Sequence, residues 1–264
     1  MIGLEKIKYN MQRHEIKFLL NEEQYTRLLP LLSEHMEPDP YGRYEVRSLY
    51  YDTDDYAIIR ACMDHPRYKE KFRLRSYGAP RADTPVFAEI KKKFKGITYK
   101  RRVDLPLSSV PAFLSGEYDP DENEQITREI RWFLGRTHPV PKVLIQYDRE
   151  PYEGVTEPLL RITFDRNVRW RTDRLRLTDD GADRSAPAYD GAAGQADPAE
   201  GAGDTLLLPE GSIIMEVKTP DTLPLWLCRF LSDEGIYRTG FSKYGVCYQR
   251  FILPTIIERT DTLC

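Results

Sequence analysis

Basic side chains recur at every second position of the segments expected to form strands, and this pattern is the strongest constraint on the fold. In residues 68–77, Arg73 and Arg75 share one face, and Phe72 and Leu74 share the other. Because side chains alternate along a strand, such a segment turns one face to an apolar core and carries charge on the other. The same pattern places these sets together: Arg13, Glu15 and Lys17; Glu89, Lys91 and Lys93; Lys100, Arg102 and Asp104; Tyr147 and Arg149; Arg161, Thr163 and Asp165; Glu216 and Lys218.

A solvated outer face explains charge on any one of these strands, but its repetition on nearly every strand favours another interpretation. Converging strands bring like charges together, which is costly unless a polyanion or a metal ion neutralises them. The planar fork of arginine suits phosphate oxygens. We therefore expect an α+β fold built on an antiparallel β-barrel or tunnel, closed or nearly closed, with flanking helices. Its basic lumen would take a polyphosphate or a nucleoside triphosphate.

Two glutamates, Glu89 and Glu216, lie among these cations and need a separate explanation. Each stands two residues before a lysine, Lys91 or Lys218. Mg²⁺ and Mn²⁺ prefer carboxylate and phosphate oxygens, so either glutamate could hold a metal ion jointly with phosphates. Simple pairing of each glutamate with a neighbouring Lys or Arg is the alternative, and both interpretations stay open.

Hydrophobic periodicity predicts many strands and few helices, which argues against a doubly wound parallel sheet. Asn21 is the expected N-cap of the first helix. Ser242 could likewise cap the last helix, with Lys243 at the mouth of a tunnel. The expected strands are 11–20, 44–52, 68–77, 86–95, 97–105, 142–152, 158–170 and 212–219, and the expected helices are 22–36, 107–116, 123–136, 222–234 and 243–251.

Residues 178–204 differ in composition from the rest of the chain. They consist mainly of Ala, Gly, Asp and Pro, and have no aliphatic side chain larger than alanine. Such a segment buries too little apolar area to offset the entropy of ordering it, so we expect a disordered insertion. About 60 residues follow it, which is marginal for an independent domain. We therefore expect a single domain over 1–264 that contains this insertion.

Overall charge and composition exclude several classes of protein. The 264 residues contain 39 Lys and Arg against 42 Asp and Glu, a net charge of −3, so a globally basic nucleic-acid or membrane binder is not expected. No run of 18 apolar residues predicts a membrane span, and the N-terminus does not resemble a secretory signal. The four scattered cysteines, without a CxxC pair, fit free thiols and a cytoplasmic location.

Short motifs along the chain resemble the VTC domain, the polyphosphate-polymerase domain of the vacuolar transporter chaperone complex, within the CYTH-like triphosphate tunnel superfamily. Each motif is weakly specific by itself, but their number and order extend over almost the whole chain outside 178–204. The motifs are RHEIKFLL (13–20), YEVRSLYYDT (44–53), KFRLRSYG (71–78), FAEIKKK (87–93), YKRRV (99–103), IQYDREPY (145–152), LRITFDRNVRW (160–170), IIMEVKT (213–219) and FSKYG (241–245).

The resemblance implies a metal-dependent enzyme that transfers the γ-phosphate of ATP to a growing polyphosphate chain, with Mn²⁺ or Mg²⁺ as cofactor. It implies that Glu216 binds the metal and that Tyr147 lines the tunnel. Arg13 stands where the wider superfamily has a glutamate, which weakens a two-metal triphosphatase interpretation. The phosphate ligands implied by the motifs are Lys17, Arg73, Arg75, Lys91, Lys100, Arg102, Arg149, Arg161, Lys218 and Lys243.

The expected partners are ATP and polyphosphate or pyrophosphate, and nucleic acid is not expected. The chain is similar to stand-alone, bacterial-type members, and a membrane partner stays open. We expect Arg73, Arg75, Lys91 and Arg161 to hold the triphosphate while Glu216 holds the metal. Two alternatives remain: hydrolysis of inorganic or nucleoside triphosphates, and a non-catalytic module that binds polyphosphate or nucleotides.

Overall fold

The computed structural model describes residues 14–64, 66–94, 97–120, 125–178 and 204–262. It shows an α+β chain whose strands pair antiparallel in the order β11-β1-β10-β8-β7-β3-β4-β5-β6, with β2 on β7 and β9 on β8. The predicted antiparallel fold with flanking helices is therefore confirmed. We expected a closed or nearly closed barrel or tunnel, and the described strands pair along an open path that ends at β11 and β6.

The described chain forms two compact units. Of the described residues, those within 14–44, 147–168 and 208–241 form unit 1, and those within 45–146, 169–178, 204–207 and 242–262 form unit 2. The strands β7 (Val140–Gly154) and β8 (Arg161–Arg171) contribute residues to both units. The expectation of a single domain over 1–264 stays a prediction, and the insertion expected at 178–204 lies outside the described residues apart from Thr178 and Asp204.

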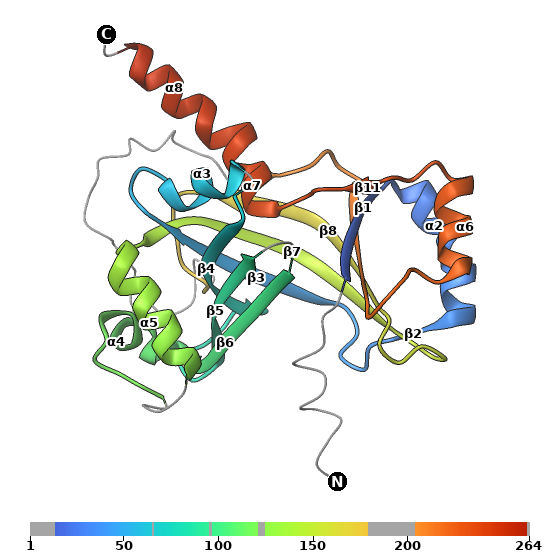
Figure 1. Cartoon of the computed structure of the whole chain (residues 1–264), viewed down its shortest axis with the longest axis horizontal. Coiled ribbons are helices and arrows are strands. Elements are labelled where there is room, and N and C mark those ends of the chain that lie inside the picture. The colour runs from blue at the N-terminus through green and yellow to red at the C-terminus, as the bar shows by residue number, and fades with distance from the viewer. Residues whose placement is uncertain (1–13, 65, 95–96, 121–124, 179–203, 263–264) are drawn as a thin grey trace. The chain divides into compact units, whose positions relative to one another are not determined.

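Unit 1 is a small antiparallel sheet with two helices on one face (Figure 1). The register of its central pair places Lys17 opposite Glu216 and Phe18 opposite Met215. Its elements are β1 (His14–Leu20), α2 (Glu22–His35), β2 (Met36–Pro38), β10 (Ile213–Thr219), α6 (Leu225–Asp233) and β11 (Arg238–Thr239), together with its parts of β7 and β8.

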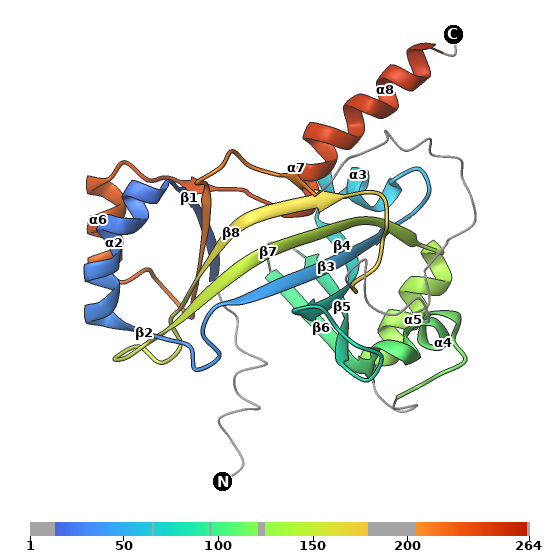
Figure 2. The same ribbon diagram turned by 180° about the vertical axis from the view of Figure 1, so that it is seen from behind.

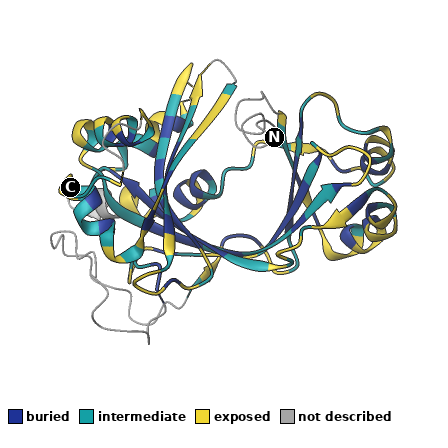
Figure 3. Cartoon of the chain, turned by 90° about the horizontal axis from the view of Figure 1, so that it is seen from below, coloured by how far each residue is buried: buried dark blue, intermediate teal, exposed yellow. Residues whose placement is uncertain are grey.

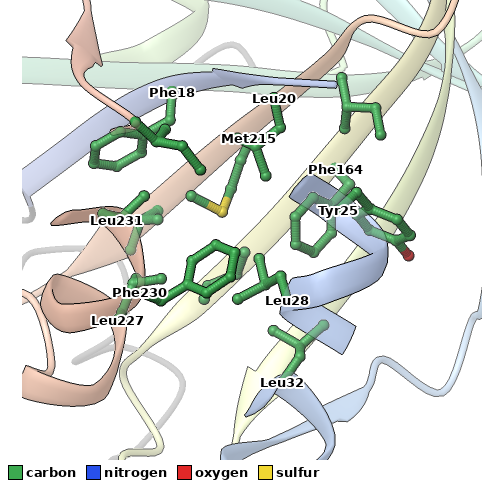
Figure 4. Packing of buried hydrophobic residues seen from close by; sticks show 14 of the residues in the cluster. Phe18, Leu20, Tyr25, Leu28, Leu32, Phe164, Met215, Leu227, Phe230 and Leu231 are labelled. Carbon is green, nitrogen blue, oxygen red and sulfur yellow. The ribbon is translucent and has the colours of Figure 1, made fainter. Parts of the chain in front are cut away.

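The alternating pattern of these strands gives unit 1 its core. Phe18, Met215 and Phe164 face the helices, and Leu28 of α2 and Leu227 of α6 close over them (Figure 4). The sequence also starts α2 sharply, because the Asn21 side chain accepts a hydrogen bond from the Gln24 amide while Gln24 bonds back to the Asn21 amide. This is the capping box expected of a stable N-terminus, and it confirms the predicted cap.

Unit 2 is built on two consecutive hairpins, and helices α4 (Val110–Ser115) and α5 (Gln125–Thr137) pack on one face of the sheet (Figure 2). Its elements are β3 (Tyr44–Asp52), α3 (Ala57–Met63), β4 (Tyr68–Tyr77), β5 (Pro85–Phe94), β6 (Ile97–Pro106), the 3-10 turn Leu107–Ser109, α4 (Val110–Ser115), α5 (Gln125–Thr137), β9 (Thr205–Leu206), α7 (Lys243–Cys247), the π-helical turn Tyr248–Ile252 and α8 (Leu253–Thr262).

The core of unit 2 lies between this sheet and helices α4 and α5. Phe72, Leu74 and Ile90 supply the sheet side, and Phe113 and Phe133 supply the helix side. All five side chains are buried. Exposed residues gather at strand ends and on the outer sides of the helices (Figure 3). In each unit one face of the sheet packs against an apolar core, and the predicted phosphate ligands of its strands lie on the opposite face.

The main departure in secondary structure concerns the helix expected over 107–116. The structure divides this segment into a 3-10 turn, Leu107–Ser109, and the short helix α4. Pro111 explains the break, because proline fits the first turn of a helix but lacks the N–H that a continuous longer helix would use. The last expected helix, 243–251, is instead α7 followed by the π-helical turn and α8.

Candidate functional site: two charged sheet faces

A buried carboxylate organises the charged face of unit 2. Glu89 on β5 is 1% exposed, and its Oε2 accepts a hydrogen bond of 2.8 Å from Arg73 Nε on β4. Arg75 Nε lies 3.8 Å from the same oxygen, and Lys100 Nζ on β6 lies 2.5 Å from Oε1. The register of the strands explains these contacts, because Glu89 is paired with Arg73 on β4 and with Arg102 on β6. We call Glu89, Arg73, Arg75, Lys100 and Tyr50 the Glu89 cluster.

Charge and burial shift the pKa values of Glu89 and Lys100 in this cluster. Burial raises the pKa of Glu89, but Arg73, Arg75 and Lys100 outweigh burial and hold the pKa well below its usual range. Burial also lowers the pKa of Lys100, to about 7, because the attraction of Glu89 only partly offsets burial and the repulsion of Arg75 and Arg73. Glu89 is therefore ionised at neutral pH, and Lys100 titrates near neutral pH.

Tyr50 on β3 belongs to this cluster and was missed from the sequence. Its phenol oxygen accepts a hydrogen bond of 2.9 Å from Arg73 Nη1, and its ring lies 5.6 Å from the Arg73 guanidinium carbon. Burial raises the pKa of Tyr50, but the positive charges of Arg73, Arg75 and Lys243 outweigh burial and lower the pKa to about 8. The alternation in YEVRSLYYD carries the signal, because Ser48 and Tyr50 share the face that pairs with Arg75 and Arg73.

A second network of contacts holds Tyr50 against helix α7. The ring of Tyr50 stacks on Tyr244 of α7 at 4.8 Å, and Tyr244 donates a hydrogen bond of 2.8 Å to Asp52 Oδ2. Asp52 also accepts hydrogen bonds from the backbone amides of Ile58 and Ile59 at the start of α3. Ser242 caps α7 as predicted, by accepting a hydrogen bond from the Gly245 amide. The buried carboxylate thus joins β3, α3 and α7.

The charged face of β4, β5 and β6 has a large excess of positive charge. Its acidic members are Glu89 and Asp104. The predicted ligands Lys91 and Arg102 lie on this face, and Arg102 also stacks over Phe87 at 4.5 Å. Its basic members are Lys69, Lys71, Arg73, Arg75, Lys91, Lys93, Lys100 and Arg102.

Unit 1 brings together the predicted residues around Glu216, but with balanced charge. Lys218 Nζ lies 2.7 Å from Glu216 Oε1, and Lys17 Nζ lies 3.4 Å from Oε2. Glu15 lies 3.2 Å from Lys17 Nζ. Burial lowers the pKa of Lys17, but Glu216 and Glu15 outweigh burial and raise it, so Lys17 stays charged. We call Glu216, Lys17, Lys218 and Glu15 the Glu216 cluster.

Two further predicted phosphate ligands of unit 1 are already paired with carboxylates. Arg149 makes a bidentate contact with Asp165, with Nε and Nη2 at 2.7 and 2.8 Å from its two oxygens, and lies 5.3 Å from the Tyr147 ring. Arg161 Nη2 lies 2.6 Å from Glu153 Oε1. An anion at either guanidinium would have to compete with these carboxylates, just as an anion at Arg73 would compete with Glu89.

Glu216 fits one kind of metal site and not another. Among the described residues, His, Cys, Asp and Glu side chains form no group of three or more that could hold a metal ion. A buried carboxylate with Glu15 nearby fits Mg²⁺ or Mn²⁺ only if phosphate oxygens supply most of the ligands, as those ions often accept. Glu89 is surrounded by three cations, which disfavours a further cation there. Its predicted role as a metal ligand stays a prediction.

One family model matches most of the chain. The VTC domain model matches residues 12–252. The chain therefore belongs to the VTC domain family, as the motifs predicted. Membership in this family supports an enzymatic activity on polyphosphate or nucleotides.

Solved structures with a similar chain path share little sequence with this protein. A putative adenylyl cyclase from Hippeastrum, described as having a dominant triphosphatase activity, has 16% identity and a TM-score of 0.47, with 89% of this chain and 94% of that chain covered. A putative adenylate cyclase from Vibrio parahaemolyticus has 10% identity and a TM-score of 0.42, with 89% and 97% covered. No curated protein matches the sequence. In the described part of the chain, no helix is long and apolar enough to cross a membrane.

Proposed function

We propose that this protein is a metal-dependent polyphosphate polymerase that transfers the γ-phosphate of ATP to a phosphate chain. The observation that carries the proposal is the excess of Lys and Arg over acids on the face formed by β4, β5 and β6. Such a surplus is costly by itself, and a polyanion neutralises it. Family membership supports the same class of substrate.

The proposed phosphate ligands in unit 2 are Arg73, Arg75, Lys91 and Lys100. Glu89 holds the Arg73 guanidinium and Ser48 accepts a hydrogen bond from Arg75 Nε, so the direction of both arginines is set before substrate binds and little reorganisation is needed. Arg102 and Lys243 are proposed as further contacts. In unit 1, the proposed contacts are Lys17, Tyr147, Arg149, Arg161 and Lys218, with Glu216 as the metal ligand.

The chemistry asked of these side chains is mainly positioning and neutralisation of charge. When bound, Mn²⁺ or Mg²⁺ would neutralise charge on the phosphate oxygens. The attacking group is the terminal phosphate of pyrophosphate or polyphosphate, and it is already anionic. Its oxygen forms the new P–O bond while the bond from the γ-phosphorus to the bridging oxygen breaks and ADP leaves. This exchange is balanced without an added proton, so a strong general base is not required.

Adjacent lysines on β5 offer a matched test. Lys91 lies on the charged face, whereas Lys92 lies on the helix-covered face, where its Nζ contacts Glu129 Oε2 at 2.9 Å. The purified protein is incubated with ATP, Mn²⁺ and a pyrophosphate primer, and products are resolved on a gel stained for polyphosphate. Wild type and Lys92→Ala should both produce a ladder of chains. Lys91→Ala should lose about ten- to a hundredfold in rate, the value of a hydrogen bond to a charged group.

Different products would overturn different parts of the proposal. Free phosphate without chains would show hydrolysis and refute the polymerase. Metal-independent binding of triphosphate without turnover would show a binding module. A Glu216→Gln variant that keeps full metal-dependent turnover would refute the metal assignment alone. Equal rates for Lys91→Ala and Lys92→Ala would refute the use of this face.

A further inference from the structure

Two aromatic residues interrupt the charged face of unit 2. Among the described residues of β4, β5 and β6, Tyr77 and Phe87 are the aromatic side chains whose register places them on that face. Their ring centroids lie 5.3 Å apart at 65°, an edge-to-face pair. Tyr77 is 43% exposed, whereas Phe87 is half-buried and carries the Arg102 guanidinium 4.5 Å from its ring. Apolar packing within the core does not explain rings on this face, because the core lies on the other one.

Register places this aromatic pair next to the Glu89 cluster. Phe87 stands opposite Arg75, and Glu89 stands opposite Arg73. Tyr77 follows Arg75 by two residues, a rise of about 7 Å along the strand. Gly78, with φ of 72°, ends the strand immediately afterwards in the left-handed region. The face therefore passes from guanidinium groups directly to an aromatic pair at its edge.

We propose that Tyr77 and Phe87 bind the base of a nucleoside triphosphate whose phosphates lie on the Glu89 cluster. This inference rests on the proposed function, in which that cluster binds the triphosphate of ATP, and it adds the residues that would hold the base. A base presents a flat π-face, and aromatic side chains bind such faces with little preference for sequence or base type. The Arg102 guanidinium lies over the Phe87 ring and adds a cation beside the aromatic pair.

The hairpin supplies a control aromatic of equal exposure. Tyr99 on β6 is also 43% exposed, but its register places it on the opposite face, between Lys100 and Thr98 in sequence. Replacing Tyr99 removes the same side chain from the same sheet without touching the charged face. If a Tyr77 variant binds nucleotide more weakly than a Tyr99 variant, the cause is therefore the position of Tyr77 on the charged face and not the loss of an exposed ring.

The experiment compares two ligands that share the triphosphate. Dissociation constants for β,γ-imido ATP and for inorganic tripolyphosphate are measured by calorimetry in Mg²⁺ with the full chain. Tyr77→Leu should weaken the nucleotide roughly fivefold to a hundredfold, the range of one base–aromatic stack, and leave tripolyphosphate unchanged. Tyr77→Trp should restore nucleotide binding. Tyr99→Leu should change neither constant.

Each other outcome decides against one proposal. If Tyr77→Leu leaves nucleotide binding unchanged, or weakens both ligands equally, the base site is refuted while triphosphate binding stands. If wild type binds neither ligand, or if Lys91→Ala leaves tripolyphosphate binding unchanged, the triphosphate assignment itself fails, and the base site fails with it. Near-ultraviolet circular dichroism of each variant confirms that the loss is not one of folding.

Discussion

Replacement of Glu89 by glutamine tests whether this carboxylate holds the charged face together. The side chain is 1% exposed, and it balances Arg73, Arg75 and Lys100, whose side chains are 19%, 7% and 43% exposed. Removing one partner of a buried ionic group costs about 3–5 kcal/mol, because the remaining charges stay buried without compensation. Lys100 adds little to this value, since water screens it. We expect Glu89→Gln to lower the free energy of unfolding of unit 2 by about 3–5 kcal/mol.

The assay must follow unit 2 by itself. Of the three tryptophans, Trp132 and Trp170 lie in unit 2 and Trp226 lies in unit 1. In a Trp226→Phe background, tryptophan fluorescence during denaturant unfolding therefore reports unit 2. Asp104→Asn is the control, because Asp104 lies on the same face but is 56% exposed and 3.5 Å from Arg102. It should cost at most about 1 kcal/mol. A loss in Glu89→Gln no larger than in Asp104→Asn would refute the reasoning.

The pH dependence of this effect has a fixed sign. The pKa of folded Glu89 lies below its ordinary value, so its stabilising contribution is fully present above the unfolded pKa, about 4.3, and is lost as pH falls through the folded pKa. Glutamine cannot titrate. In a Lys100→Arg background, in which the residue paired with Glu89 does not titrate near neutral pH, the difference in stability between the chains without and with Glu89→Gln should therefore be constant from pH 7 to about 5 and shrink at lower pH. A difference that grows on acidification would contradict the assignment of charge.

Three further predictions concern single interactions. Tripolyphosphate affinity, measured by calorimetry, should fall as pH rises from 6 to 9, because Lys100 loses its proton near its pKa of about 7 and Tyr50 gains negative charge near its pKa of about 8. Lys100→Arg should remove the loss of affinity near pH 7, and Tyr50→Phe should remove the loss near pH 8. If both variants keep the pH dependence of the wild type, these two groups do not cause it. Tyr244→Phe should lower the free energy of unfolding by about 1–3 kcal/mol, since the buried Asp52 loses a hydrogen bond; a denaturant midpoint equal to that of wild type would contradict this. Asn21→Ala should cost about 1 kcal/mol by the same measurement, with Asn21→Ser as the conservative control.

Much of the local structure could be predicted from the sequence because its signals are local. The strand 68–77 was predicted with its observed bounds, and Asn21 was predicted as a cap. The assignment of Arg73 and Arg75 to one face and Phe72 and Leu74 to the other also agrees with the structure. In each case the side-chain period or a short hydrogen-bonding motif acts within a few residues, so no distant partner is needed.

The candidate site was less predictable because its contacts join distant parts of the chain. Tyr50 was missed, although it meets Arg73 across the β3–β4 pair. Arg149 and Arg161 were predicted as phosphate ligands, but the structure places Asp165 and Glu153 on them. A carboxylate several residues or a strand away becomes a partner only when the register of pairing is fixed, and the core of the whole sheet fixes that register.

The sequence by itself determined that each strand has a charged face and an apolar face, because alternation follows from backbone geometry alone. It also identified the VTC family, since the motifs occur in order along the chain. Tertiary structure decided how the charges are shared. Strand pairing surrounds Glu89 with three cations in unit 2 and gives the cations of unit 1 their own carboxylates. That distribution depends on long-range register, and it leaves an excess of Lys and Arg over acids on the face of β4, β5 and β6.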